Sequence, residues 1–258
     1  MTLHVDASGQ GPPLVLLHGW AMHSGAWGPL PPRLARRYRV HAVDLPGHGH
    51  SAPLPAFTLD GVVAALEAAF ATSAQPLTVV GWSLGGLIAM RWALAQPECV
   101  TRLVLIAATP RFVASEDWPH ALSAETLARF GDELHVAWKP TVERFLALQV
   151  HGSEHGRATL ALMREQLFAR GEPSPGMLAG ALAVLAGTDL RPDLAALAQP
   201  TLVVAGSRDT LILPGAGAWL AEHLPDAKCI TISGAGHAPF LSHPEAFAAA
   251  VEAFLDGR

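Results

Sequence analysis

Short apolar runs rich in β-branched residues alternate along this chain with longer segments of helical periodicity, and this alternation strongly constrains the fold. Most residues in each run are apolar, as expected of a strand covered on both faces. The strand candidates are residues 14–17, 39–43, 77–80, 103–106, 201–205 and 228–232, and helical candidates include residues 59–71, 86–95 and 244–255. The pattern predicts an α/β fold with a mostly parallel central sheet flanked by helices.

The strand signal disappears from about residue 112 to residue 189, where the chain has a helical pattern. We expect this segment, residues 112–189, to form a helical cap inserted between two strands. Residues 1–111 and 190–258 then form the core of a single domain, which is within reach of a 258-residue chain that is 50% hydrophobic. The cap would lie over the carboxyl edge of the sheet, where open α/β sheets bind their ligands.

Composition excludes several classes of function. The formal net charge of −5, without any cluster of Lys and Arg, argues against a nucleic-acid partner. Two cysteines are too few for a disulfide framework, and the N-terminus shows no export signal, so we expect a cytoplasmic protein. We expect it to act as a monomer. The uncharged stretch over residues 68–90 is long enough to cross a bilayer, but its polar residues and Gly and Pro favour helix, loop and strand instead.

The five residues Gly81-Trp-Ser-Leu-Gly85 match the motif G-x-S-x-G. Ser83 falls between a predicted strand and a predicted helix, which is the context of a nucleophile elbow, the sharp turn that exposes a reactive serine. The helix N-terminus that follows would also favour a developing oxyanion. The alternative is a glycine-rich turn with an incidental serine.

A serine needs a base and an orienting carboxylate, which in this motif class follow in the order Ser, Asp, His. Asp209 comes just after strand 201–205, and His237 just after strand 228–232. A single Asp in such a turn more often caps a helix, but the ordered pair favours catalysis. Asp189 and Asp193 are competing carboxylates, yet they precede the strand. The sequence therefore predicts Ser83, Asp209 and His237 as a catalytic triad.

The oxyanion hole should combine two backbone amides, one after the nucleophile and one from the loop after the first central strand. These are the amides of Leu84 and Trp20. We interpret His18, in the same loop, as a structural residue that shapes the turn.

Two pairs of histidines raise the alternative of a metal site. His48 and His50 are two residues apart, and His151 and His155 are four residues apart. The second pair lacks the Glu that a zincin motif requires, and Gly152 weakens a helix there. We predict no metal site and no cofactor.

Several longer runs resemble a known family. The segments around His18-Gly-Trp20, Asp44 to Ser51 and the elbow are similar to α/β-hydrolases in general. The more specific runs 81–87, 116–119, 141–149 and 237–244 resemble the pimeloyl-[acyl-carrier protein] methyl ester esterases, carboxylesterases of biotin synthesis. The resemblance spans nearly the whole chain, and the run over 141–149 is the most discriminating.

The resemblance implies a substrate, a partner and a set of binding residues. The substrate would be the methyl ester of a pimeloyl chain on acyl carrier protein, with small esters as surrogates. The residues around it would be Trp20, Ser83, Leu84, Phe145, Leu146, Ala147, Leu148, Gln149 and His237. Phe145, Leu146 and Leu148 could line an apolar channel, although each could equally be part of the packing face of the cap.

The family's cap also presents arginines to the acidic carrier protein, and Arg144 and Arg157 match such positions. Two further family positions fall on Pro140 and Ala161, for which Lys139 and Arg164 could compensate. Docking through these residues is a hypothesis, because acids slightly outnumber bases across the cap.

The sequence thus predicts a serine carboxylesterase that releases methanol and the pimeloyl carboxylate. Fold and triad do not determine the substrate, so a broad short-chain esterase, a lactonase and a carbon–carbon bond hydrolase are alternatives. A ligand receptor that retains the triad without hydrolysis is an alternative of a different class.

Overall fold

The computed structural model describes residues 2–257 and contains a seven-stranded sheet in the order β1-β3-β2-β4-β5-β6-β7. Strand β1 is antiparallel to β3, and every other neighbouring pair is parallel. The strands are β1 (Val5–Ser8), β2 (Pro13–Leu17), β3 (Arg39–Val43), β4 (Leu77–Trp82), β5 (Val100–Ile106), β6 (Thr201–Gly206) and β7 (Ala227–Ile232). The predicted α/β fold with a mostly parallel sheet is confirmed.

Six of the seven strands lie where the apolar runs predicted them, with small shifts at their ends. The sequence did not indicate β1, a four-residue strand at the edge of the sheet whose residues are only partly buried or exposed. An edge strand of this kind pairs through its backbone on one side only, so its side chains carry no continuous apolar signal.

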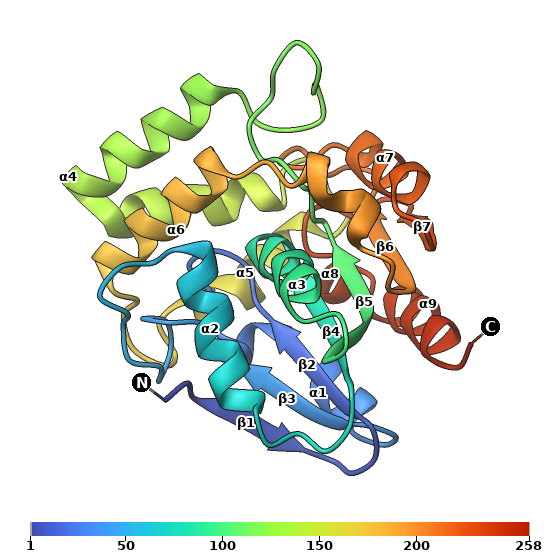
Figure 1. Ribbon diagram of the computed structural model, residues 1–258. Coiled ribbons are helices and arrows are strands. Elements are labelled where there is room, and N and C mark those ends of the chain that lie inside the picture. The colour runs from blue at the N-terminus through green and yellow to red at the C-terminus, as the bar shows by residue number, and fades with distance from the viewer. Residues whose placement is uncertain (1, 258) are drawn as a thin grey trace.

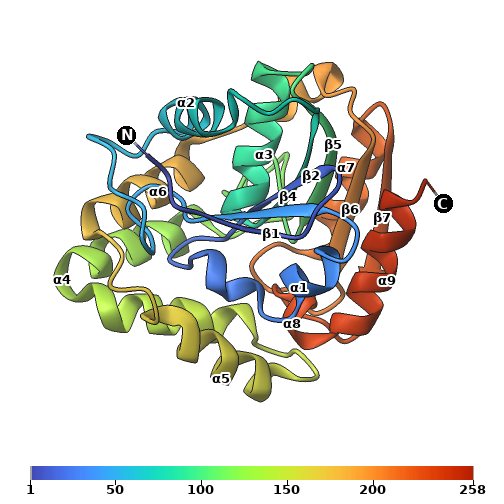
Figure 2. The ribbon, with the colours of Figure 1, turned by 90° about the horizontal axis from the view of Figure 1, so that it is seen from below.

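Helices cover both faces of the sheet (Figures 1 and 2). Helices α2 and α3 lie on one face, whereas α1, α8 and α9 lie on the other (Figure 2). The helices of this core are α1 (Leu30–Leu34), α2 (Leu59–Phe70), α3 (Leu84–Ala95), α7 (Pro214–His223), α8 (Pro239–Ser242) and α9 (Pro244–Leu255), with the 3₁₀ turns η1 (Ser24–Trp27) and η2 (Arg191–Ala196). The three helices that periodicity predicted correspond to α2, α3 and α9.

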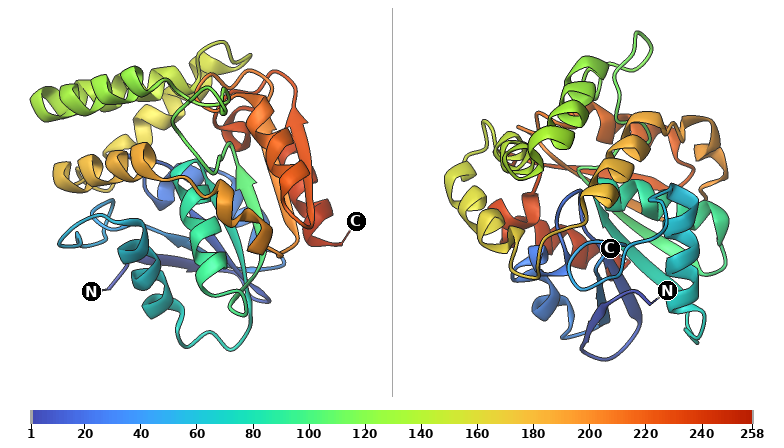
Figure 3. Two further views of the ribbon diagram at one scale, coloured as in Figure 1. Left: turned by 45° about the horizontal axis from the view of Figure 1, so that its top comes forward. Right: turned by 90° about the vertical axis from the view of Figure 1, so that its left-hand side faces the viewer.

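Three helices lie within the segment expected to form the cap: α4 (Ala124–Gln149), α5 (Gly156–Leu167) and α6 (Pro175–Gly187). They lie together beyond the carboxyl ends of the parallel strands, and α4 and α6 run alongside each other (Figures 1 and 3). Helix α4 is interrupted at Ala137, where φ is −150° and ψ is 69°, three residues before Pro140. Pro140 has no amide hydrogen to donate to Val136, and its ring crowds the preceding turn, which accounts for the kink.

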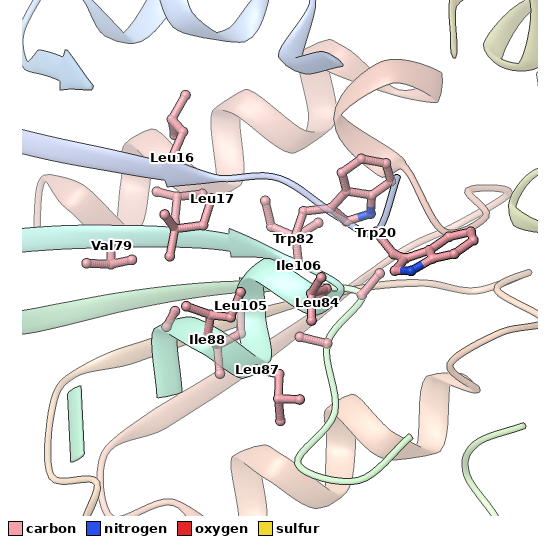
Figure 4. Close-up of a cluster of buried hydrophobic side chains, with 14 of the residues drawn as sticks. Leu16, Leu17, Trp20, Val79, Trp82, Leu84, Leu87, Ile88, Leu105 and Ile106 are labelled. Atoms are coloured by element: carbon pink, nitrogen blue, oxygen red, sulfur yellow. The ribbon is translucent and has the colours of Figure 1, made fainter. Parts of the chain in front are cut away.

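The core of the sheet is continuous with the elbow. Side chains from β2, β4, β5 and α3, among them Leu17, Trp82, Leu84 and Ile106, form one buried apolar cluster (Figure 4). The uncharged stretch over residues 68–90 comprises the end of α2, a loop, β4 and the start of α3, as the sequence indicated. Within residues 2–257, no helix combines the length and apolarity needed to span a bilayer.

Candidate active site

Ser83, His237 and Asp209 lie in one continuous chain of hydrogen bonds. The distance from His237 Nε2 to Ser83 Oγ is 2.8 Å, and that from His237 Nδ1 to Asp209 Oδ2 is also 2.8 Å. Ser83 follows β4, Asp209 follows β6 and His237 follows β7, so the three loops meet at the carboxyl edge of the sheet. All three residues are at most 3% exposed.

The surroundings of Asp209 determine the tautomer of His237. Asp209 Oδ1 accepts hydrogen bonds from the amides of Leu211 at 2.9 Å and Ile212 at 3.1 Å. Its other oxygen, Oδ2, faces His237 Nδ1, which must carry the proton and donate it. His237 Nε2 is therefore the acceptor, and the Ser83 hydroxyl donates to it.

Ser83 has the strained backbone expected of a nucleophile elbow, with φ at 55° and ψ at −115°. The turn is held by the Ser83 amide, which donates to the Ile106 carbonyl at 2.9 Å. Gly85 allows the elbow to approach β2, because a Cβ at this position would lie 2.0 Å from the Leu17 carbonyl oxygen. The strain persists because neighbouring strands and α3 hold the turn on both sides.

The amides of Trp20 and Leu84 come from the two segments that meet at this elbow. Neither amide donates to an acceptor among residues 2–257, and the loop of Trp20 packs directly on the elbow, since a Cβ on Gly19 would lie 3.2 Å from the Trp82 ring. Two unpaired donors beside a serine hydroxyl are suited to stabilising a negatively charged oxygen.

His18 controls the orientation of one of these donors. Its Nε2 accepts from the Leu45 amide at 2.9 Å, so Nδ1 carries the proton and donates to the Gly19 carbonyl at 2.8 Å. Because the peptide is planar and trans, holding the Gly19 carbonyl on one side directs the Trp20 N–H to the other. Burial lowers the pKa of His18 to about 3, so the ring stays neutral and keeps both bonds.

Two further residues hold His237, and sequence reasoning did not identify their roles. Trp82 Nε1 donates to the His237 carbonyl at 2.8 Å, while the His237 amide donates to the Gln149 carbonyl at 3.0 Å. Trp82 occupies a variable position of the elbow motif, and the Gln149 contact is made by its backbone. Residue type therefore carried no signal for either role.

The end of α4 supplies the residues that the resemblance assigned to substrate binding. The Phe145 ring packs against the Trp20 ring with 4.8 Å between centroids, and the Trp20 indole donates to the Leu178 carbonyl of α6 at 3.0 Å. Leu146 is fully buried, whereas Ala147 and Leu148 are partly exposed. Gln149 is 3% exposed, and its Oε1 has no hydrogen-bond partner within residues 2–257.

The two predicted docking arginines lie on different helices of the segment 112–189. Arg144 is on α4, is about half exposed and forms an ion pair with Glu133. Arg157 lies exposed in the first turn of α5. Of the residues expected to compensate, Lys139 pairs with Glu172 and Arg164 is exposed.

The other carboxylates and histidines that the sequence offered as candidates lie outside the triad. Asp189 pairs with Arg191 and Arg111, and Asp193 is an exposed residue of η2. His48 is buried with its Nδ1 3.0 Å from the Pro46 carbonyl, and His155 packs against His243 at 5.0 Å.

Comparison with known proteins agrees with this geometry. Residues 12–244 match the family model of the alpha/beta hydrolase fold. The chain belongs to the α/β-hydrolase family. A protein of Xanthomonas campestris pv. campestris (strain B100) named pimeloyl-[acyl-carrier protein] methyl ester esterase is 49% identical, over 98% of both chains. The protein of the same name from Chromobacterium violaceum is 45% identical, over 99% of both chains.

The solved structure of an esterase from Exiguobacterium antarcticum has a similar fold. Its TM-score is 0.88 at 20% identity, over 98% of this chain and 95% of that chain. The resemblance deduced from the sequence motifs is confirmed by the curated relatives, and the solved structure confirms the fold.

Proposed function

We propose that this chain is a serine carboxylesterase that hydrolyses the methyl ester of pimeloyl-[acyl-carrier protein]. The observation that supports this most directly is the hydrogen-bonded chain from Ser83 Oγ through His237 to Asp209, with both distances at 2.8 Å. The ester itself is inferred from relatives of that name, which cover 98% of the chain at up to 49% identity.

In the first half of the proposed reaction, His237 Nε2 takes the proton of Ser83 as the serine oxygen attacks the ester carbonyl. The amides of Trp20 and Leu84 donate to the resulting oxyanion, and removal of one such donor typically costs about 3 kcal/mol of barrier. Asp209 stabilises the charged imidazole. His237 then donates its proton to the methanol that leaves, which yields an acyl-enzyme.

In the second half, water takes the position of the alcohol. His237 removes a proton from this water, which attacks the acyl-enzyme carbonyl, and the same two amides hold the second oxyanion. His237 returns the proton to Ser83 Oγ as the acid is released. The carbonyl of Gln149 and the indole of Trp82 hold the backbone of His237 in place throughout.

We propose that residues 112–189 act as the cap that binds the acyl chain. Phe145 and Trp20 offer an apolar surface beside the elbow, and Leu148 lies on the same helix. Gln149 Oε1 is a buried acceptor without a hydrogen-bond partner among residues 2–257, so it is available to a donor group of the substrate. We further propose that Arg144 and Arg157 contact the acidic carrier protein.

Methanol release from carrier-bound pimeloyl methyl ester tests the proposed substrate. We expect wild type to prefer this ester over p-nitrophenyl esters of other chain lengths. Ser83→Ala should abolish turnover of every ester, whereas the exposed control Ser73→Ala should keep it. Efficient turnover of simple esters without turnover of the carrier-bound ester would reject the substrate but retain the esterase. Failure of wild type to hydrolyse any ester would support a non-hydrolytic receptor.

Charge reversal tests the docking residues. Arg144→Glu with Arg157→Glu should raise KM for the carrier-bound ester and leave KM for a small ester unchanged. The proposed carrier protein contacts these exposed side chains, whereas a small ester does not. Arg36→Glu, at an exposed position after α1, is the matched control. Equal effects on both esters would contradict carrier docking at this surface.

A further inference from the structure

A cluster of three metal-ligating side chains lies outside the triad, at the edge of the sheet where β1 meets β3. His4 precedes β1, Asp44 follows β3, and His50 lies in the loop beyond it. One ligand atom from each residue lies within 4.8 Å of those of the other two. We propose that His4, Asp44 and His50 bind one divalent transition-metal ion, of which Zn²⁺ is the representative.

The backbone of the three residues already holds them together without a metal. The Asp44 amide donates to the His4 carbonyl at 3.0 Å, and the His50 amide donates to Asp44 Oδ2 at 2.9 Å. Ser51 joins His4 to Asp44 a second time, because its hydroxyl accepts from the His4 amide at 2.8 Å and donates to the Asp44 carbonyl at 2.6 Å. Such preorganisation reduces the entropy lost when ligands gather around an ion.

The donor atoms suit a borderline metal such as Zn²⁺. Two imidazoles and one carboxylate form a common zinc ligand set, which leaves the fourth position to water. His4 Nε2 lies 3.0 Å from Asp6 Oδ1, an arrangement in which a carboxylate orients the ring and leaves Nδ1 free to bind metal. The ring nitrogens of His50 form no hydrogen bond with any other residue of the described chain.

The local charge also favours a cation. Asp44 is a buried carboxylate whose Oδ1 accepts from the Ser24 amide at 2.7 Å and whose Oδ2 accepts from the His50 amide at 2.9 Å, and bonds of this kind favour its charged form. Asp6 is a second carboxylate, and Arg170 is the cation paired with both, at 2.6 Å from Asp6 Oδ2 and 3.7 Å from Asp44 Oδ2. With neutral histidines the group has a net charge of about −1, which a dication reverses.

Arg170 gives the site its sharpest test. It comes from the segment between α5 and α6, and its positive charge opposes a second cation on the same carboxylates. A unit charge a few ångströms away, at an effective dielectric constant of about 20, is strong enough to change affinity by about tenfold or more. Arg170→Met, which retains an unbranched apolar side chain, should therefore tighten metal binding.

Calorimetric titration of untagged, metal-free protein with Zn²⁺ tests the proposal, and Co²⁺ absorption reports the ligands. We expect one ion per chain with a dissociation constant in the micromolar range or lower. His50→Ala, at an exposed position, and His4→Ala should each weaken binding by about thirtyfold or more, because each removes one of three protein ligands. The paired control His151→Ala with His155→Ala should leave affinity unchanged.

The results of the titration support or overturn the proposed metal site as follows. Stoichiometric binding that is lost in His50→Ala and His4→Ala, and tightened in Arg170→Met, supports the site. Absence of stoichiometric binding, or binding that both single variants retain, overturns it. Loss of binding in the His151 and His155 control would place the ion elsewhere and also overturn it.

Discussion

Replacement of Asp209 by asparagine tests whether the tautomer of His237 determines the activity. Asp209 Oδ1 accepts from the Leu211 and Ile212 amides at 2.9 and 3.1 Å, so an asparagine must place its oxygen there. Its amide nitrogen then faces His237 Nδ1, across the 2.8 Å distance that Oδ2 now spans, and donates to it. The ring proton moves to Nε2, which can no longer accept the proton of Ser83.

The expected loss of kcat is large because His237 no longer acts as a base. The variant keeps the shape of the site, so the loss reports this change alone. The same exchange in a serine-protease triad lowers kcat by about 10⁴-fold, which corresponds to about 5.5 kcal/mol of activation barrier. We expect a similar loss for Asp209→Asn, with KM for a small ester nearly unchanged, since no group that contacts the ester in the ground state is removed.

Stopped-flow hydrolysis of a p-nitrophenyl ester measures the acylation rate, and a melting curve shows whether the variant is folded. Asp193→Asn changes an exposed carboxylate of η2 and is the matched control, expected to keep wild-type kcat. A folded Asp209→Asn protein with kcat within tenfold of wild type, a threshold far above the expected loss, would refute the tautomer argument.

Three further substitutions follow from contacts around the site and the core. His18→Leu should lower kcat by about tenfold to a hundredfold with a smaller change in KM, because the Gly19 carbonyl and hence the oxyanion amide lose their anchor; steady-state kinetics would contradict this if only KM changed. Gly85→Ala should prevent folding, since its Cβ would lie 2.0 Å from the carbonyl oxygen at the end of β2, whereas Gly131→Ala, with its nearest neighbour at 3.8 Å, should be tolerated; circular dichroism distinguishes them. The Arg33 guanidinium lowers the pKa of Glu252, so this pair should stabilise the protein above the ordinary carboxyl pKa of 4.5 and lose that effect as pH falls through the lower folded pKa. Urea unfolding of wild type and Glu252→Gln across that range should converge at low pH, and parallel curves would exclude the coupling.

Much of the fold was predictable because it depends on local patterns. Strands buried on both faces appear as short apolar runs, and the helices between them show their own periodicity. Chain order then predicted which loops meet, since parallel strands place their carboxyl ends at one edge. For this reason the sequence could predict that the side chains of Ser83, Asp209 and His237 lie together.

Other features of the site depend on contacts between distant residues. Trp82 holds the carbonyl of His237 across 155 positions in the chain, and the Gln149 carbonyl holds its amide. Backbone acceptors are present in every residue, so no residue type could indicate these bonds. The role of His18 likewise required the positions of the Leu45 amide and the Gly19 carbonyl.

The histidines show most clearly which contacts depend on the tertiary structure and not on spacing along the chain. Spacing along the chain suggested pairing His48 with His50, yet His48 turns inward against His18, with 5.3 Å between their ring centroids. His50 instead faces His4, with 4.8 Å between ring centroids, because the antiparallel pairing of β1 with β3 brings the N-terminus beside Asp44. The sequence by itself predicted six of the seven strands, the elbow and the chain order of Ser83, Asp209 and His237, since these follow from local periodicity and chain order. Only the tertiary structure decided which distant groups hold His237 and which side chains meet at the sheet edge, because those contacts depend on how separately formed layers pack.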